Sequence, residues 1–336
     1  MFSPASAVPE TRLLAADGVA YGFLGSAVAI DGDLAAVGAY GDDDRGARSG
    51  SAYVFERSNG VWTQTAKLNA EDAEQGDYFG WSVAISGDRI VVGASRDDDA
   101  GAYSGSSYLF ERESGGWCQT AKLTAGDAAA SDGFGESVAI FGTNIVVGAY
   151  QDADCGQYSG SAYVFRKAGA GWVQSGKLVA SDGAAGDRLG YSVALDGHDA
   201  LCGAWYATRN LLTACGAAYV FDVSNVSNTV PVARDQTASL PAEGERYIDL
   251  DFSDPDGQAM TFRVVSPPTN GVLESYEDRN GTTGYAGRYY YSWDGVSRQD
   301  TFTWEVTDGQ GTSTVATVTI QNRHAGVEDL VRLHGA

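Results

Sequence analysis

The chain has 336 residues, 44 glycines, 7 prolines and a formal net charge of −22. A field of that sign repels nucleic acid and anionic membranes and attracts cations, so we expect neither of the first two as partners. The sequence lacks both a run of about 18 apolar residues, which a transmembrane helix needs, and a basic segment followed by an apolar one near Met1, so no signal peptide is visible.

A unit of 55 residues recurs four times from the N-terminal end. In its second copy, residues 80–94, an apolar and β-branched run, a turn glycine and a second apolar run predict two antiparallel strands. The copies begin at Gly25, Gly80, Gly135 and Gly190. A constant period of this size indicates a repeat architecture.

Each period contains four expected strands, which is typical of a β-propeller blade. The repeated aromatic residues, among them Tyr53, Phe55 and Trp62, are expected to pack between blades rather than to bind a ligand. In the second period the expected strands span residues 80–85, 89–94, 106–111 and 117–123.

An acidic loop follows each of the first three Gly-Ala segments. Its pattern, Asp-x-Asp-x-Gly, places alternate carboxylates in a tight turn, where they could converge on Ca²⁺; the alternative is an Asx turn with a solvated charge cluster. The carboxylates repel one another and few lysines lie nearby in the sequence, which favours calcium. The candidate ligands are Asp42, Asp44, Asp97, Asp99, Asp152 and Asp154, and, more weakly, Asp43 and Asp98.

A second acidic series precedes each Phe-Gly or Leu-Gly pair. These residues lie in the connections between blades, where aspartates commonly cap turns, and we expect that role for them. The series consists of Asp72, Asp77, Asp127, Asp132, Asp182 and Asp187.

The last repeat lacks a fourth strand after residues 217–222, and residues 225–230 form a linker. Residues 11–17 lie one period before residues 66–72, which they resemble. We therefore expect the N-terminal strand to complete the last blade and close a ring of four blades. The alternative is that the four blades are part of a larger propeller.

Residues 231–322 lose the period and contain six or seven short strand-like runs between turns. This pattern predicts an Ig-like or cadherin-like β-sandwich. Asp254, Asp256 and Asp308 are further calcium candidates there, or ordinary β-turn residues. The tail, residues 323–336, has no strand pattern and is expected to be disordered.

The sequence shows no catalytic motif, and only His198 lies outside the tail among its three histidines. A site that is used once should break the symmetry of the repeats, and residues 204–212 do so. Trp205, Tyr206 and Arg209 are therefore candidate ligand contacts, unless the segment reflects drift in a terminal blade.

The four cysteines have no Cys-x-x-Cys spacing, so we expect no zinc site. Cys202 and Cys215 lie at the two ends of one loop and could form a disulfide in an exported protein. Two free thiols are the alternative.

Two parts of the chain resemble known families. Phe79-Gly80 with Val92-Gly93-Ala94 and the adjacent acidic loop resemble the FG-GAP repeat of integrin α-subunits and bacterial surface proteins, over residues 10–222. The resemblance implies a β-propeller, adhesion or ligand recognition outside the cell, and often bound calcium. This chain departs from it in having four repeats where integrin heads have seven, and in lacking the aspartates of the fourth loop.

The C-terminal part, residues 230–322, resembles the cadherin-like domains of bacterial surface proteins, which act as spacers. The whole chain is thus expected to be all-β, with an FG-GAP β-propeller (8–224), a linker (225–230), a cadherin-like or Ig-like sandwich (231–322) and a tail (323–336).

We expect a non-catalytic protein of the cell surface that recognises a protein or glycan ligand, with calcium in its propeller loops. One alternative is an enzyme-associated propeller, either a hydrolase or an accessory carbohydrate-binding domain. A plainer alternative is a structural array of repeats without a ligand of its own.

Overall fold

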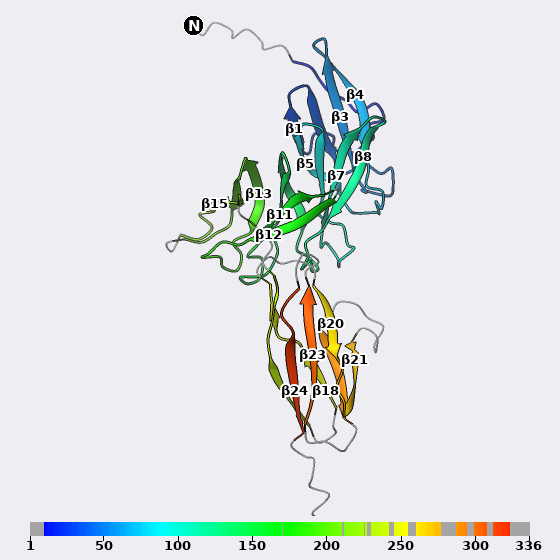
Figure 1. The fold of residues 1–336 in the computed structure, drawn as a ribbon. Helices are drawn as coiled ribbons and strands as arrows, with labels where there is room; N and C mark the ends of the chain where they lie inside the picture. Colours follow the sequence, from blue (N-terminus) through cyan, green and yellow to red (C-terminus); the bar gives the residue numbers. More distant parts are fainter. Residues whose placement is uncertain are drawn as a thin grey trace, which may run out of the picture. The chain divides into compact units, whose positions relative to one another are not determined.

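A computed structural model gives the fold of the chain, and the secondary-structure elements of the residues that it describes are β-strands, as predicted (Figure 1). The chain divides into two compact units, residues 1–226 and 227–336. In the part that the structure describes, no helix is long and apolar enough to cross a membrane. The described residues are 10–169, 171–209, 212–224, 226, 230–241, 245–254, 260–276, 287–293, 299–307 and 312–322.

The N-terminal unit contains four antiparallel sheets that follow one another along the chain (Figure 1). Each strand pairs with the next, so every sheet is a meander, with four strands in the first three sheets and three in the fourth. The first two sheets comprise β1 (Val28–Asp31), β2 (Leu34–Ala39), β3 (Ser51–Ser58), β4 (Val61–Leu68), β5 (Phe79–Ser86), β6 (Arg89–Ala94), β7 (Ser106–Glu113) and β8 (Gly116–Leu123). The other two comprise β9 (Phe134–Phe141), β10 (Asn144–Ala149), β11 (Ser161–Ala168), β12 (Gly171–Leu178), β13 (Leu189–Asp196), β14 (Asp199–Ala204) and β15 (Ala217–Asp222).

Glycines allow the backbones of consecutive sheets to touch. A Cβ atom on Gly93 of β6 would lie 2.1 Å from the carbonyl oxygen of Gly135 in β9, the first strand of the next sheet. Gly135 itself has a φ of 88°, which other residues rarely adopt. Ser82 Oγ donates a hydrogen bond to the same Gly135 oxygen at 2.8 Å. The Phe-Gly and Val-Gly-Ala motifs are therefore the two halves of the contact between sheets.

Aromatic residues of one sheet pack against small residues of the sheet before it. Phe79 is fully buried and meets the rings of Tyr108 and Phe110 edge-on, with centroids 5.5 and 5.9 Å away. Such stacking fills the space between facing sheets, so the predicted packing role of these aromatic residues is confirmed. The preceding sheet contributes small side chains to this core: Ala36, Ala52 and Val54.

The N-terminal segment lies on the first sheet, and its predicted pairing with the fourth sheet is not observed among the described residues. Leu13 packs against the core of the first sheet, and the amide of Ala16 donates to Gln64 Oε1 at 2.8 Å. In the second sheet, the amide of Glu71 donates to Gln119 in the same way at 3.0 Å. Residues 11–17 thus act as the connection that precedes each sheet. Among the described residues, no strand pairing links the fourth sheet to the first, so ring closure is not observed.

The two outermost sheets expose apolar side chains that the inner sheets bury. Val28 of the first sheet is 72% exposed, whereas Val83, one period later, is 9% exposed. Val220 of the fourth sheet is 68% exposed, whereas the equivalent Val164 is completely buried. The first and fourth sheets therefore each expose to solvent an apolar face that, in the two inner sheets, is covered by a neighbouring sheet.

The C-terminal unit is a β-sandwich. One sheet has the order β17-β24-β23-β20 and the other β18-β22-β21, with a short β16-β19 pair, and β17 and β24 run parallel. Both sheets contribute to one core, in which Trp304 and Tyr291 are fully buried. Its strands are β16 (Val232–Ala233), β17 (Gln236–Leu240), β18 (Glu245–Asp249), β19 (Phe252–Ser253), β20 (Thr261–Ser266), β21 (Gly271–Ser275), β22 (Arg288–Trp293), β23 (Gln299–Thr307) and β24 (Ala316–Asn322).

Candidate functional site

Each of the first three acidic loops surrounds a lysine from the last strand of its own sheet. In the second sheet, Lys122 Nζ lies 2.7 Å from Asp72 and 3.1 Å from Asp97, and it also pairs with Asp99. The ammonium group lies over the ring of Tyr108, 5.2 Å from its centroid, and the Tyr108 hydroxyl donates to Asp97 at 2.7 Å. We call this arrangement of one lysine, three aspartates and one tyrosine a lysine clasp.

The third sheet contains the most buried clasp. Lys177 Nζ lies 2.6, 2.9 and 2.5 Å from Asp127, Asp152 and Asp154, and the lysine side chain is only 5% exposed. Tyr163 donates to both Asp152 and Asp127. The first sheet repeats the arrangement with Lys67, Asp17, Asp42, Asp44 and Tyr53.

The clasps keep their lysines charged. Burial by itself lowers the pKa of Lys177, but Asp127, Asp152 and Asp154 around it raise that pKa by more, so the net change is upward. The pKa values of Lys67 and Lys122 rise for the same reason, against the same effect of burial. The ammonium ions are therefore permanent at neutral pH.

The acidic loops also form Asx turns. The amide of Asp99 donates to Asp97 Oδ1 at 3.2 Å, and the amide of Asp154 donates to Asp152 Oδ1 at 3.1 Å. Aspartate side chains favour this bond to the backbone two residues on. The Asx turns that we considered as the alternative to calcium are thus observed. The carboxylates of these turns are paired with a lysine, however, and not only with solvent.

A resident calcium ion does not fit these residues. Ca²⁺ takes six to eight oxygen ligands, and Asp127, Asp152 and Asp154 are the group in the described residues whose ligand atoms come close enough to share a metal ion. Lys177 already lies within hydrogen-bond distance of all three carboxylates. A cation at their centre would have to displace its ammonium group. The predicted calcium ligands therefore do come together, but around a lysine.

The fourth repeat has a different cation. Ala207 and Arg209 stand where the other loops have their two aspartates, and no fourth strand that could supply a lysine is present in the described part of this repeat. Arg209 Nε lies 2.9 Å from Asp182, and its Nη2 lies 2.8 Å from Asp187. The same guanidinium contacts the hydroxyl of Tyr219. Arg209, predicted as a ligand contact, is thus engaged inside its own repeat.

Half of the second acidic series caps turns, as predicted. Asp77 Oδ2 accepts from the amide of Glu74 at 2.6 Å, and Asp132 Oδ2 accepts from the amide of Ala129 at the same distance. Asp187 makes the equivalent bond. The other half of the series, Asp72, Asp127 and Asp182, faces the lysines and Arg209 instead.

Asp77 should make stability depend on pH. Burial raises the pKa of Asp77 from 3.8 to about 6, so the folded state holds this proton more tightly than the unfolded chain. Its contribution therefore falls as the pH rises from about 4 through about 6. Asp77→Asn, which keeps an acceptor for the turn, should raise the melting temperature more at about pH 7.5 than at about pH 4.5.

Thermal melts of the full chain at the two pH values test this expectation. Asp88→Asn removes a charge from an exposed turn in the same sheet and serves as the control. Equal differences between Asp77→Asn and the unsubstituted chain at both pH values would contradict a raised pKa for Asp77.

A second set of residues lies where the repeats differ from one another. Three positions vary in each repeat: those on either side of the Phe-Gly or Leu-Gly pair, and the one after Gly-Ala. They carry mostly aromatic and charged side chains. In chain order the three sets are Phe23, Tyr78, Gly133 and Arg188; Ser26, Trp81, Glu136 and Tyr191; and Tyr40, Ser95, Tyr150 and Trp205.

The aromatic side chains at these positions form two groups. In the first, the ring of Tyr40 lies 5.1 Å from Phe23, 5.3 Å from Tyr78 and 4.9 Å from Trp81, measured between centroids. In the second, the ring of Tyr191 contacts the rings of Tyr150 and Trp205, and the ring of Trp205 also contacts that of Tyr206. We call the combined surface the aromatic–arginine face: Phe23, Tyr40, Tyr78, Trp81, Arg96, Tyr103, Tyr150, Arg188, Tyr191, Trp205 and Tyr206.

A pocket of about 420 Å³ joins the two groups. Trp81 lines one part of it, and Tyr191 and Trp205 line another. The guanidinium of Arg188 lies 5.5 Å from the Trp205 ring. Of the described residues that line the pocket, Glu136 is the one carboxylic acid, and burial raises its pKa.

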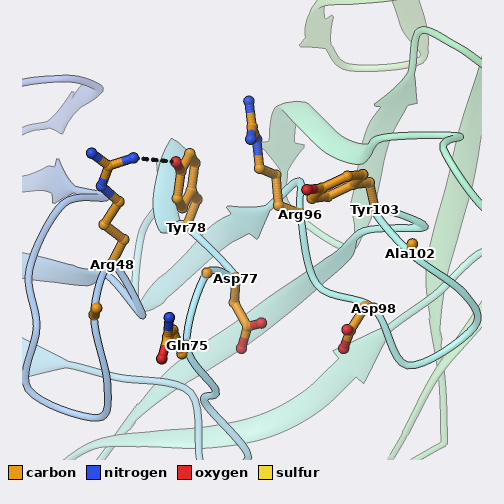
Figure 2. A pocket seen from close by; sticks show the side chains of 10 residues that line it. Arg48, Gln75, Asp77, Tyr78, Arg96, Asp98, Ala102 and Tyr103 are labelled. Carbon is orange, nitrogen blue, oxygen red and sulfur yellow. Dashed lines mark hydrogen bonds between the residues drawn. The ribbon is translucent and has the colours of Figure 1, made fainter.

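An adjoining pocket of about 490 Å³ shares Arg96 and Tyr103 with the first. Figure 2 shows Arg96 between Tyr78 and Tyr103, and its guanidinium lies 4.6 and 5.4 Å from the two ring centroids. Arg48 Nη1 donates to the Tyr78 hydroxyl at 3.0 Å (Figure 2). Asp77 also contributes to the lining. The two pockets thus share a boundary formed by Arg96 and Tyr103.

The structure places two of the three predicted ligand contacts on this face. Trp205 and Tyr206 are 47% and 46% exposed there. The sequence analysis missed the residues from the first three repeats. A comparison of the repeats position by position would have found them, because they flank motifs that otherwise barely change.

The remaining candidates are two cysteines and five aspartates. Cys202 is buried in the core of the fourth sheet and Cys215 is exposed, and both are free, which is the second of the two alternatives given above. Burial raises the pKa of the Cys202 thiol to about 12. Asp254 follows β19, and Asp256 and Asp308 lie outside the described residues. Asp43 accepts the amide of Arg48, and Asp98 lines the pocket of Figure 2.

The repeated sheets and their loops define a β-propeller type of repeat protein. Four segments match the FG-GAP repeat, namely residues 8–55, 62–110, 117–165 and 172–221, and residues 228–321 match a bacterial Ig domain. The FG-GAP matches together cover more than half of the chain, which therefore belongs to the FG-GAP repeat family. No curated protein shows significant similarity to the chain. Both kinds of domain are typical of extracellular proteins, and they fit adhesion or ligand recognition.

Proposed function

We propose that this chain is a non-catalytic, exported protein that recognises a glycan through the aromatic–arginine face. The observation that carries the proposal is the location of the residues that differ from one repeat to the next. Side chains that hold the sheets together recur in each repeat, whereas Trp81, Tyr150 and Trp205 occupy varied positions and gather around one pocket. Functional residues of a repeat array are expected at such positions, because packing does not dictate them.

The chemistry of the face suits a sugar ligand with acidic groups. Exposed aromatic rings such as those of Tyr103 and Trp205 present flat apolar surfaces to the C–H faces of sugars. Arg96 and Arg188 offer planar donor groups that match carboxylates or sulfates. These guanidinium groups gather on one surface of a chain whose formal net charge is −22, so they supply local attraction for an anion.

The lining of the pocket favours binding over hydrolysis. Glycosidases use two carboxylic acids on opposite sides of the bond that they cleave. Glu136 is the one carboxylic acid among the described residues that line the pocket at Trp205. Its carboxyl oxygens can instead accept hydrogen bonds from sugar hydroxyls.

We expect Trp205→Ala to weaken glycan binding by about tenfold or more, which corresponds to the loss of about 1.4 kcal/mol. The reason is that one stacking surface of the pocket disappears while the inter-sheet core stays intact, since the side chain is 47% exposed. The measurement is a glycan array with the full chain, followed by calorimetric titration of the best ligand with both proteins.

Phe141→Ala is the matched control. Phe141 is also 47% exposed, and it ends β9, whereas Phe134 begins that strand beside the varied positions. The control should bind like the unsubstituted chain. If no glycan on the array binds, or if the two variants lose affinity equally, the proposed function is wrong.

A further inference from the structure

The acidic loops of this chain need a positive charge, and the structure shows where it comes from. Three carboxylates converge in each of the first three clasps, and an ammonium ion has three N–H donors, one for each of them. In the third clasp Lys177 reaches all three within 2.9 Å. The geometry recurs in three sheets with different neighbours, so it belongs to the repeat rather than to one location.

The distribution of lysine along the chain points the same way. The chain contains only four lysines, Lys67, Lys122, Lys167 and Lys177. Three of them occupy the clasp position, and Lys167 pairs with Glu111 at 2.7 Å. A residue type that is almost absent elsewhere thus returns at one position of each complete repeat.

The fourth repeat provides an independent comparison. Its described residues lack the strand that would carry the lysine, and its loop has Ala207 and Arg209 in place of two aspartates. The remaining carboxylate, Asp182, pairs with Arg209 instead. Aspartates that served to bind Ca²⁺ would not need a lysine on a neighbouring strand. Here the aspartates and the lysine disappear together, and an arginine restores the charge.

The charge that the lysine does not neutralise faces water. The outer carboxylates Asp99 and Asp154 are 62% and 39% exposed, whereas the inner ones, Asp97 and Asp152, are almost completely buried. Each inner carboxylate also accepts a tyrosine hydroxyl and a backbone amide. The buried oxygens are therefore satisfied without a metal ion.

We propose that the cation of each FG-GAP loop in this chain is one of its own side chains, a lysine in the first three repeats and Arg209 in the fourth. The loops, the preceding connection and the last strand of each sheet are thereby tied together without calcium. This differs from what the resemblance to integrin-type repeats implies. The inference does not depend on the glycan ligand, because it concerns a different set of residues.

Thermal melts of the full chain in EDTA and in millimolar calcium test the inference. The unsubstituted chain should melt at the same temperature in both. Lys177→Met should melt lower in EDTA by about 5 °C or more, because three partly buried carboxylates lose their partner. Calcium should restore much of that loss, since the freed carboxylates can then bind it.

Two further variants make the test specific. Lys177→Arg keeps the charge and should lose less than Lys177→Met, and Lys167→Met removes a lysine outside the clasps and should not respond to calcium. If Lys177→Met does not fold in EDTA, refolding from denaturant with and without calcium gives the same comparison. A calcium-dependent rise for the unsubstituted chain, or a Lys177→Met variant as stable as that chain, would overturn the inference.

Discussion

Gly93→Ala should abolish the cooperative folding of the N-terminal unit. The new Cβ would lie 2.1 Å from the carbonyl oxygen of Gly135, a backbone atom of the next sheet that cannot rotate away. It would also lie 2.3 Å from Ser82 Oγ, the donor to that same oxygen. The second and third sheets would have to separate, and the core between them would open. We expect a loss of about 3 kcal/mol or more, as for other severe packing errors.

Gly203→Ala is the control that isolates the contact between sheets. Gly203 occupies the same position of the fourth sheet, but its nearest neighbours are atoms of Ser192 in the adjacent strand. The closest is the hydroxyl oxygen, which can move to another rotamer. The two variants are compared by urea unfolding of the full chain. Equal losses of unfolding free energy would show that the contact with Gly135 is not what makes Gly93 necessary.

The sequence predicted the repeated sheets accurately, because their signals are local. The strands expected at 89–94 and 106–111 are observed as β6 and β7, with differences of at most two residues at their ends. Alternating and continuous apolar runs between turn glycines carry that information. The Ig-like sandwich was predicted for the same reason and agrees with the match to a bacterial Ig domain.

The predicted pairing of the N-terminal segment with the fourth sheet is not observed among the described residues, because one alignment supports two roles for this segment. Residues 66–72 contain the end of a strand and then a connection that reaches the next sheet, where Asp72 meets Lys122. Residues 11–17 resemble both parts. In the structure only the connection keeps its role, with Asp17 bonded to Lys67 of the first sheet. The period of the repeats alone does not show whether such a segment contacts the sheet that precedes it or the sheet that follows it.

The lysine clasps could not be found by inspecting the acidic loops alone. Lys122 lies 23 residues from Asp99 and 50 residues from Asp72 in the sequence, so no local pattern joins them. The strands β7 and β8 bring the lysine back to the loop that precedes β7. The parallel loss of the lysine and the aspartates in the fourth repeat was the available signal.

Asp300→Ala should unfold the C-terminal unit at temperatures where the rest of the chain is stable. Asp300 is 5% exposed, and it accepts hydrogen bonds from the amides of Thr269, Asn270 and Thr301 and from the hydroxyl of Tyr291, at 2.8 to 3.0 Å. Alanine would leave these donors without their acceptor. We expect a loss of about 3–5 kcal/mol, which is a large part of the stability of a small domain.

Hydrogen exchange of β22 and β23 measures this loss directly, and Asp249→Ala is the control. Asp249 is 65% exposed and pairs with Arg288 at the surface, so its removal should cost less than about 1 kcal/mol.

The dependence of stability on acid pH provides a second test of the role of Asp300. Burial alone would raise the pKa of Asp300, but the hydrogen bonds from the backbone and Tyr291 lower it below 3.8.

The stabilisation from Asp300 is therefore complete above about pH 4 and is lost as the pH falls below that value. The unsubstituted unit should lose its advantage over Asp300→Ala in strong acid, and an advantage that did not change with pH would show that Asp300 acts by packing rather than by charge.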